Sequence, residues 1–199
     1  MKLLALNGSI RAAAGNTHRA LALGRTVAEA NGHEWQTIQL ATYSDRVDQL
    51  YETLRTADAW LLASGVYWGS WGSPLQRFLE VLTPLETTPS ILGKPVGVLL
   101  TCDSTDGMSI AARLLGVLTH FGCCAPPCAT LVLSRLGQRA IDADDEDVWR
   151  PSDIATVIHN LASAAHARPA WHAWPVQPVS PLSGPYPAPG ALPLMVEDF

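Results

Sequence analysis

The sequence has no cluster of lysine or arginine residues, and charged residues of all kinds occupy only 16% of its 199 positions. The formal net charge is -5. Nucleic acids and anionic membrane surfaces are bound through basic patches, so neither is expected as a partner. Any phosphate group that the protein binds has to be held locally, by backbone amides and a few side chains.

Long hydrophobic runs are also missing. No segment reaches the roughly 18 to 20 uninterrupted apolar residues that a membrane-spanning helix needs, and the apolar run at the N-terminus is too short for a signal peptide. We therefore expect a cytoplasmic protein without a membrane partner. Hydrophobic residues still make up 48% of the chain, which is enough for one domain with a proper core.

Several sequence motifs of common catalytic sites are absent. The chain contains neither G-x-x-x-x-G-K-[ST] nor H-E-x-x-H, which argues against a nucleoside triphosphatase and a zinc protease. It has no G-x-G-x-x-G, and its second predicted strand ends in Gln39-Leu40 without the carboxylate that binds a ribose, so a tightly bound dinucleotide is disfavoured there. The stretch "GSWGS" is not the G-x-S-x-G of a serine hydrolase.

Cysteine is scarce, with Cys102, Cys123, Cys124 and Cys128 as its only occurrences. A structural zinc site usually needs a second Cys/His pair at a recognisable spacing, and no such pair is present. We expect no metal site. In a reducing compartment these residues remain thiols.

What the first 165 residues do contain is a regular alternation of strand and helix patterns. Apolar runs predict strands over 2–7, 34–40, 59–65, 95–101 and 129–134. Helices are predicted over 16–31, 45–56, 72–82, 107–121 and 151–165. Since parallel strands need crossover connections, this order predicts an α/β protein with a five-stranded parallel sheet and helices on both faces. Ligands bind such sheets at the carboxyl ends of the strands, which are followed here by the loops after residues 7, 65 and 101.

The loop after the first strand, "NGSIRAAAGNTH", has the composition of an anion site. A helix N-terminus offers unpaired N–H groups and a partial positive charge. Gly8 lets the chain leave the strand sharply, and Arg11 can form two parallel hydrogen bonds with a phosphate. Further donors near the helix start are Ser9, Asn16, Thr17 and His18. An ordinary turn capped by Asn16 or Thr17 explains the loop equally well when it is considered alone.

The loop after the third strand, "SGVYWGSWGS", places Tyr67, Trp68 and Trp71 among glycines and serines. The glycines allow backbone amides to approach a planar ligand, and the aromatic rings can cover its faces. The alternative is a hydrophobic corner whose tryptophans pack into the core. Core aromatic residues seldom occur in a stretch this rich in glycine and serine, so a ligand loop is favoured.

Taken together, these stretches resemble the NADPH-dependent FMN reductase branch of the flavodoxin-like superfamily. "GSIRAAAGNT" resembles its phosphate loop, "ADAWLLASGVYWGSWGSPLQRFLE" its second signature, and "LGKPVGVLLTCDSTDGMS" its fourth strand with a Gly-containing loop. The likeness covers about residues 2–165. It implies a flavodoxin-like three-layer sandwich that binds FMN, over 1–166. A proline-rich arm, 167–199, follows without a recognised counterpart.

The resemblance implies a set of residues around FMN. The residues expected to hold the phosphate are Ser9, Arg11, Asn16 and Thr17, with His18 adjacent. Those expected to border the isoalloxazine ring are Gly65, Val66, Tyr67, Trp68 and Gly69. Those expected at the other edge of the ring are Thr101, Cys102, Asp103 and Gly107. Two departures stand out: Gly65 replaces a usual proline, which predicts a more flexible loop, and Gln76 replaces a usual lysine, which predicts altered surface pairing.

The activity that the resemblance implies is FMN-dependent NAD(P)H oxidation. Hydride would pass from a nicotinamide to the flavin and then to a small acceptor such as a quinone, free flavin or azo compound. The flavin carries this chemistry, so no catalytic residue is assigned. The alternatives are an FMN-binding electron carrier or redox sensor, and a scaffold that has lost its cofactor. The intact Ser9, Arg11 and Asn16 argue against the latter.

A homodimer, or a tetramer built from dimers, is also expected. Relatives commonly pair so that a second subunit helps to wall the flavin site, and Trp71 stands at the exposed end of an apolar helix face. The tail holds eight prolines between Pro169 and Phe199, which exclude a long helix. The alternatives for the tail are a disordered, extended segment and an arm that lies on a surface, and its two tryptophans favour the arm. Trp171 and Trp174 would then pack across the same junction as Trp71, unless the apolar helix face is ordinary core and the tail is loose.

Overall fold

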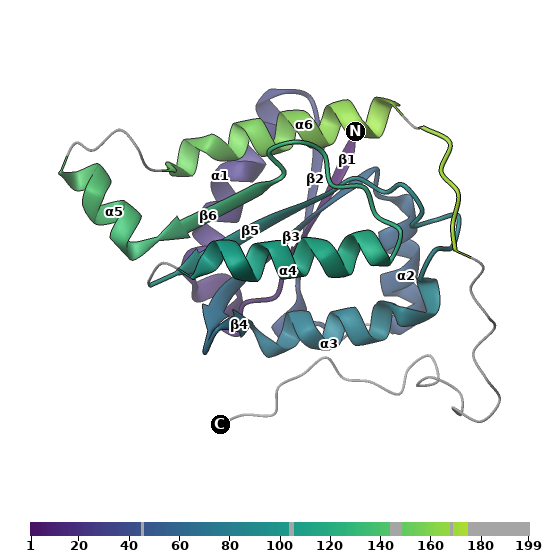
Figure 1. Cartoon of the computed structure of the whole chain (residues 1–199), viewed down its shortest axis with the longest axis horizontal. Coiled ribbons are helices and arrows are strands. Elements are labelled where there is room, and N and C mark those ends of the chain that lie inside the picture. Colours follow the sequence, from purple (N-terminus) through teal and green to yellow (C-terminus); the bar gives the residue numbers. More distant parts are fainter. Residues whose placement is uncertain (45, 104–105, 144–148, 168, 175–199) are drawn as a thin grey trace.

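A single, mostly parallel sheet forms the centre of the computed structural model, which describes residues 1–44, 46–103, 106–143, 149–167 and 169–174. Five parallel strands follow the order β2-β1-β3-β5-β6 (Figure 1). Their bounds are β1 (Lys2–Asn7), β2 (Glu34–Gln39), β3 (Ala59–Tyr67), β5 (Val96–Cys102) and β6 (Thr130–Ser134). A two-residue strand, β4 (Ser70–Trp71), pairs antiparallel with the end of β3.

Helices cover both faces of this sheet. The α-helices of the described chain are α1 (Asn16–Ala30), α2 (Val47–Thr56), α3 (Ser73–Leu82), α4 (Gly107–His120), α5 (Arg135–Asp142) and α6 (Ile154–Ala167), and all of them except α5 pack on the sheet. Short 3-10 turns occupy Ala12–Ala14, Leu40–Thr42, Thr83–Leu85 and Pro151–Asp153. The helices α1 and α6 pack on one face, and α2, α3 and α4 pack on the other (Figure 1). The predicted three-layer α/β sandwich with five parallel strands is confirmed.

The two-sided burial explains why the strands are so apolar. Successive side chains of a strand point to opposite faces. Leu4 and Leu6 of β1 pack with α2, α3 and α4, whereas Leu3 and Ala5 pack with α1 and α6. Because both faces are covered, every one of these positions has to be apolar.

Two elements were not predicted. The strand β4 exists because the chain reverses directly after β3, and two residues are too few for a sequence pattern. The helix α5 has eight residues, and the hydroxyl oxygen of Ser134 caps its start by accepting the N–H of Gly137 at 2.8 Å. No helix in the part of the chain that the structure describes has both the length and the apolar character of a membrane span.

The segment after α6 passes the amino ends of the strands. There Trp171 lies against Gly93, where an added Cβ would be 2.4 Å from Cδ1 of the indole. Both residues line a second pocket, of about 370 Å³. Trp71 lies in β4 at the carboxyl end of the sheet, so within one chain Trp71 and Trp171 do not share the expected junction. The remainder of the predicted arm, 175–199, lies outside the described residues.

The cysteines carry free thiols. Burial raises the pKa of the Cys123 thiol to about 12, so this thiol stays protonated at neutral pH. Among the residues that the structure describes, no group of His, Cys, Asp and Glu side chains is arranged to hold a metal ion.

Candidate functional site

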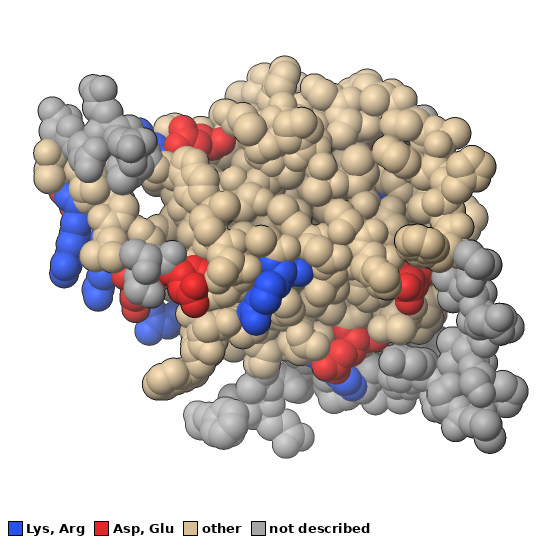
Figure 2. Space-filling view, in the orientation of Figure 1, with Lys and Arg blue, Asp and Glu red and all other residues tan. Residues whose placement is uncertain are grey.

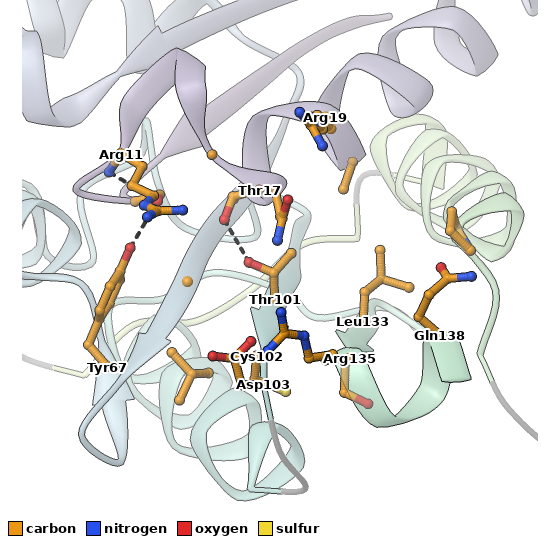
Figure 3. A pocket seen from close by; sticks show the side chains of 18 of the residues that line it. Arg11, Thr17, Arg19, Tyr67, Thr101, Cys102, Asp103, Leu133, Arg135 and Gln138 are labelled. Carbon is orange, nitrogen blue, oxygen red and sulfur yellow. Dashed lines mark hydrogen bonds between the residues drawn. The ribbon is translucent and has the colours of Figure 1, made fainter. Parts of the chain in front are cut away.

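A cavity of about 990 Å³ opens at the carboxyl ends of the strands (Figure 3). The chain runs from β1 to β2 on one side and then to β3 on the other, so the strand order reverses between β1 and β3. Open α/β sheets bind ligands at such a switch point. The volume lies at the upper end of the roughly 300–1,000 Å³ that is typical of small-molecule sites.

Twelve of the fourteen predicted site residues line this cavity: Ser9, Arg11, Asn16, Thr17, Gly65, Val66, Tyr67, Trp68, Gly69, Thr101, Cys102 and Asp103. The other two, His18 and Gly107, are not part of the lining. Nδ1 of His18 lies 3.2 Å from Nε2 of Gln39. A Cβ at Gly107 would be 2.3 Å from Cγ1 of Val132, so this glycine allows α4 to pack closely on β6.

The first loop presents open donors at the start of α1. Gly15 is the N-cap residue, and no side chain caps this helix, so the alternative of an ordinary turn capped by Asn16 or Thr17 is not what forms. The first N–H groups of a helix lack helical acceptors and carry its partial positive charge. Arg11 lines the cavity beside them and forms no ion pair with a described residue. This donor set fits a phosphate group.

Two buried hydroxyls connect the three loops (Figure 3). Ser9, which is 2% exposed, has its Oγ 3.3 Å from the Tyr67 hydroxyl. Thr17, which is 1% exposed, has its Oγ1 2.8 Å from Oγ1 of Thr101. The first loop is therefore tied to the second loop by one hydrogen bond and to the third by another.

Glycines allow the first two loops to touch. A Cβ at Gly8 would be 2.4 Å from Cβ of Leu75, and a Cβ at Gly72 would be 2.5 Å from the carbonyl oxygen of Gly8. Both backbones are also held in place, because the N–H of Gly8 donates to Ala63 at 2.7 Å and the N–H of Gly72 donates to Oγ of Ser64 at 2.8 Å. Larger residues do not fit at either position without moving a loop.

Gly65 serves packing rather than loop flexibility. It lies within β3 and pairs with Thr101 of β5. A Cβ here would be 3.0 Å from the Tyr67 ring, so the glycine leaves the space that this ring occupies. The expected flexible loop at this position is thus replaced by regular strand.

Side chains of α3 and α4 hold the turn between β3 and β4 in place. Nη2 of Arg113 donates to the carbonyl oxygen of Gly69 at 3.0 Å, and its guanidinium lies 5.4 Å from the ring centre of Trp71. Oε1 of Gln76 accepts the indole N–H of Trp71 at 3.0 Å. The glutamine that replaces the usual lysine therefore helps to fix an aromatic side chain next to the site.

Trp68, at the tip of this turn, is strained and exposed. Its φ is 48°, that of Gly69 is 75°, and its side chain is fully exposed at 104%. Two positive φ angles in a two-residue hairpin turn favour Asn-Gly. A non-glycine residue in this region costs about 1–3 kcal/mol, which indicates that Trp68 is not there for stability.

We expect the substitution Trp68→Asn to raise the free energy of unfolding by about 0.5–1 kcal/mol, because asparagine tolerates a positive φ and little buried area is lost. Urea denaturation measures this change. The matched control is Trp174→Asn, at an exposed residue without a positive φ, which should leave stability unchanged. A loss of stability in Trp68→Asn alone would show that the indole makes a stabilising contact.

Sequence reasoning missed the far side of the cavity, which α1, β6 and the segment after β6 provide. Its residues are Arg19, Ala20, Leu23, Leu133, Ser134, Arg135, Gln138, Ile141, Trp149 and Pro151. The signal was available, because the loop after the fifth predicted strand also lies at the carboxyl edge of the sheet. Gly15 and Asp106 complete the lining.

The chain is similar to flavin-binding proteins in sequence and in structure. Residues 1–137 match the family model of NADPH-dependent FMN reductase. No curated protein matches the chain at a significant level.

Three solved structures illustrate the structural likeness. RosB with the bound intermediate 8-demethyl-8-formylriboflavin-5'-phosphate is 18% identical, with 84% of this chain and 79% of that chain covered and a TM-score of 0.70. FerB, a flavoenzyme NAD(P)H:(acceptor) oxidoreductase from Paracoccus denitrificans, is 19% identical, with coverages of 83% and 95% and a TM-score of 0.60. A flavodoxin from the domain Archaea is 13% identical, with coverages of 83% and 99% and a TM-score of 0.60. At these identities the likeness establishes a flavodoxin-like fold.

Proposed function

The chain belongs to the NADPH-dependent FMN reductase family, and on this basis we propose that it is an oxidoreductase that passes electrons from NAD(P)H through FMN to a small-molecule acceptor. Family membership implies FMN as the cofactor and NAD(P)H as the co-substrate. The observation that carries the proposal is the uncapped start of α1, beside Arg11, in a cavity at the β1/β3 switch point.

The residues have distinct roles in this proposal. Arg11, Asn16 and the first-turn amides of α1 hold the phosphate. Residues 65–69 and 101–103 border the ring, and Ser9 and Thr17 keep these loops in place through their hydroxyls. His18 and Gly107 do not belong to the proposed binding set. FMN, when held by these residues, would supply the hydride-transfer and electron-transfer chemistry.

The proposed acceptor is a quinone, free flavin, azo compound or similar small molecule. Support comes from FerB, which is described as an NAD(P)H:(acceptor) oxidoreductase. Further support comes from a solved structure described as an NADPH-quinone reductase. It is 13% identical, with 86% of this chain and 100% of that chain covered and a TM-score of 0.55.

Anaerobic mixing of the FMN-loaded protein with NADPH tests this function. We expect rapid loss of the flavin absorbance, followed by its recovery when a quinone is added. The same experiment with NADH gives the preference between the two donors. A flavin that stays oxidised with both donors, although FMN is bound, would favour an electron carrier or redox sensor.

We also propose that the protein acts as a homodimer or as a tetramer of dimers. Large apolar side chains are exposed near the cavity, at Ile10 on the first loop, at Trp68 on the second loop and at Met108 in the first turn of α4. Exposed apolar residues of this kind support an interface. Size-exclusion chromatography with light scattering should give two or four times 21.3 kDa for the FMN-loaded protein at micromolar concentration, and a single chain mass would contradict the proposal.

A further inference from the structure

The cavity extends past the residues assigned to FMN, into the part of it that lies between α1, β6 and α5 (Figure 3). We call this part the α5 lobe and define it by six residues that line it: Arg19, Leu23, Leu133, Arg135, Ile141 and Trp149. The family match ends at residue 137, within α5, so Ile141 and Trp149 lie beyond it. Part of this wall therefore lies outside the residues that the family model matches.

The α5 lobe has an apolar surface that could bind a planar ring of a ligand. Leu23 is 48% exposed and Trp149 is 43% exposed, and both line the same cavity. Leu133 and Ile141 add half-buried aliphatic side chains. Leucine, isoleucine and tryptophan side chains that converge on one concavity are the usual walls of a small-molecule site.

The arginines of the cavity differ from four others in the described chain. Arg25, Arg46, Arg55 and Arg77 pair with nearby carboxylates on the outer surface. Arg19 and Arg135 line the α5 lobe and form no ion pair with a described residue. In Figure 3 the Arg135 side chain extends into the cavity toward Thr101 and Asp103.

The surrounding charge is consistent with an anionic ligand. Basic and acidic side chains are both present at the α5 end of the molecule (Figure 2), so the relevant difference lies in the cavity lining. Within the cavity lining, the described residues include three arginines, Arg11 being the third, but only two carboxylates, Asp103 and Asp106. Arginine forms bidentate, charge-assisted hydrogen bonds with phosphates, carboxylates and similar anions.

We propose that the α5 lobe binds the anionic, ring-bearing part of a second ligand beside FMN. Trp149 and Leu23 contact the ring, and Arg19 and Arg135 bind the anion. Two sources share this chemistry: the adenosine diphosphate half of NAD(P)H, and an aromatic acceptor with a sulfonate or carboxylate group. The inference rests on the proposed function, because it places one of the two substrates of that reaction.

Isothermal titration of the FMN-loaded protein tests the lobe without any turnover. The probes are ADP and anthraquinone-2-sulfonate, with menadione as a neutral ring. We expect the wild type to bind at least one anionic probe, and Arg135→Gln, Arg19→Gln or Trp149→Ala to weaken that probe about tenfold. Arg135→Gln and Arg19→Gln should change menadione binding less than twofold.

The identity of the affected probe separates the two sources. Weakened ADP binding, with a raised KM for NADPH, assigns the lobe to the donor. Weakened anthraquinone-2-sulfonate binding alone assigns it to an acceptor. The control for Arg135 is Arg139→Gln, on the same helix but outside the lining, and the control for Trp149 is Trp174→Ala. Both controls should bind like the wild type.

Two results would overturn the proposal. One is a wild type that binds neither anionic probe. The other is a set of three variants whose affinities for both probes stay within twofold of the wild type. Failure of the proposed function gives a different pattern, since the flavin then stays oxidised in the anaerobic mixing experiment while the anionic probes still bind and the variants still weaken them.

Discussion

Replacing Gly72 by alanine is expected to weaken FMN at least tenfold and to lower the free energy of unfolding by about 1–3 kcal/mol, the usual cost of overpacking. The new Cβ would be 2.5 Å from the carbonyl oxygen of Gly8, and this distance has to grow. Neither backbone can move without breaking a hydrogen bond. The N–H of Gly8 donates to the carbonyl oxygen of Ala63 in β3, and the N–H of Gly72 donates to the buried hydroxyl of Ser64. The substitution therefore pushes apart the first loop, which is proposed to hold the phosphate, and the second loop, which is proposed to border the ring.

A fluorescence titration with FMN and a urea denaturation of the apoprotein measure the two effects. The matched control is Gly116→Ala in α4, where an added Cβ meets nothing within 4 Å. There alanine should raise the free energy of unfolding by about 0.5–1 kcal/mol and leave FMN affinity unchanged. Wild-type behaviour of Gly72→Ala in both measurements would mean that the first two loops are not in fixed contact.

The strands could be predicted to within two residues because burial on both faces leaves a plain signature. The residues of β3 from Ala59 to Gly65 are all buried, and no polar residue except Ser64 interrupts them. The end of β3 was less predictable. Val66 and Tyr67 remain in the strand because they pair with β4, and a strand of two residues has no pattern of its own.

The candidate site was predictable where it lies in loops and less so where it lies on a helix. Side chains three or four positions apart share one face of a helix. Asn16, Arg19, Ala20 and Leu23 follow this spacing, and all four line the cavity. His18 falls on another side of α1, beside Gln39. Adjacency to the loop suggested His18, whereas helical geometry would have selected Arg19 and Leu23.

The helix α5 shows what a single sequence does not reveal. Its segment, "RLGQRAID", has only eight residues, contains a glycine and has no fully buried residue, so it is too short for a periodic pattern to identify it. Its local support is the Ser134 cap and a hydrogen bond from Nε2 of Gln138 to Asp142 at 2.9 Å. Such a helix depends on its neighbours, and propensity alone does not predict it.

The other large effect is expected from Arg11→Ala, which should weaken FMN about tenfold or more and leave the fold intact. Loss of one charge-assisted contact with a phosphate costs about 1.5–3 kcal/mol. The side chain is exposed and forms no ion pair with a described residue, so its removal breaks no structural contact of that kind. Affinity and stability should therefore separate in this variant, whereas in Gly72→Ala they fall together.

Riboflavin, which lacks the phosphate, makes the test of Arg11 specific. The wild type should prefer FMN over riboflavin, and Arg11→Ala should lose most of that preference by weakening FMN alone. Arg11→Lys should recover part of it, because a lysine keeps the charge but not the bidentate geometry. The control is Arg25→Ala. Arg25 lies on α1, the helix that follows the first loop, and pairs with Glu29, so this variant should bind both flavins like the wild type. An equal loss of riboflavin and FMN in Arg11→Ala would place this arginine at the ring, and unchanged binding of both would remove it from the site.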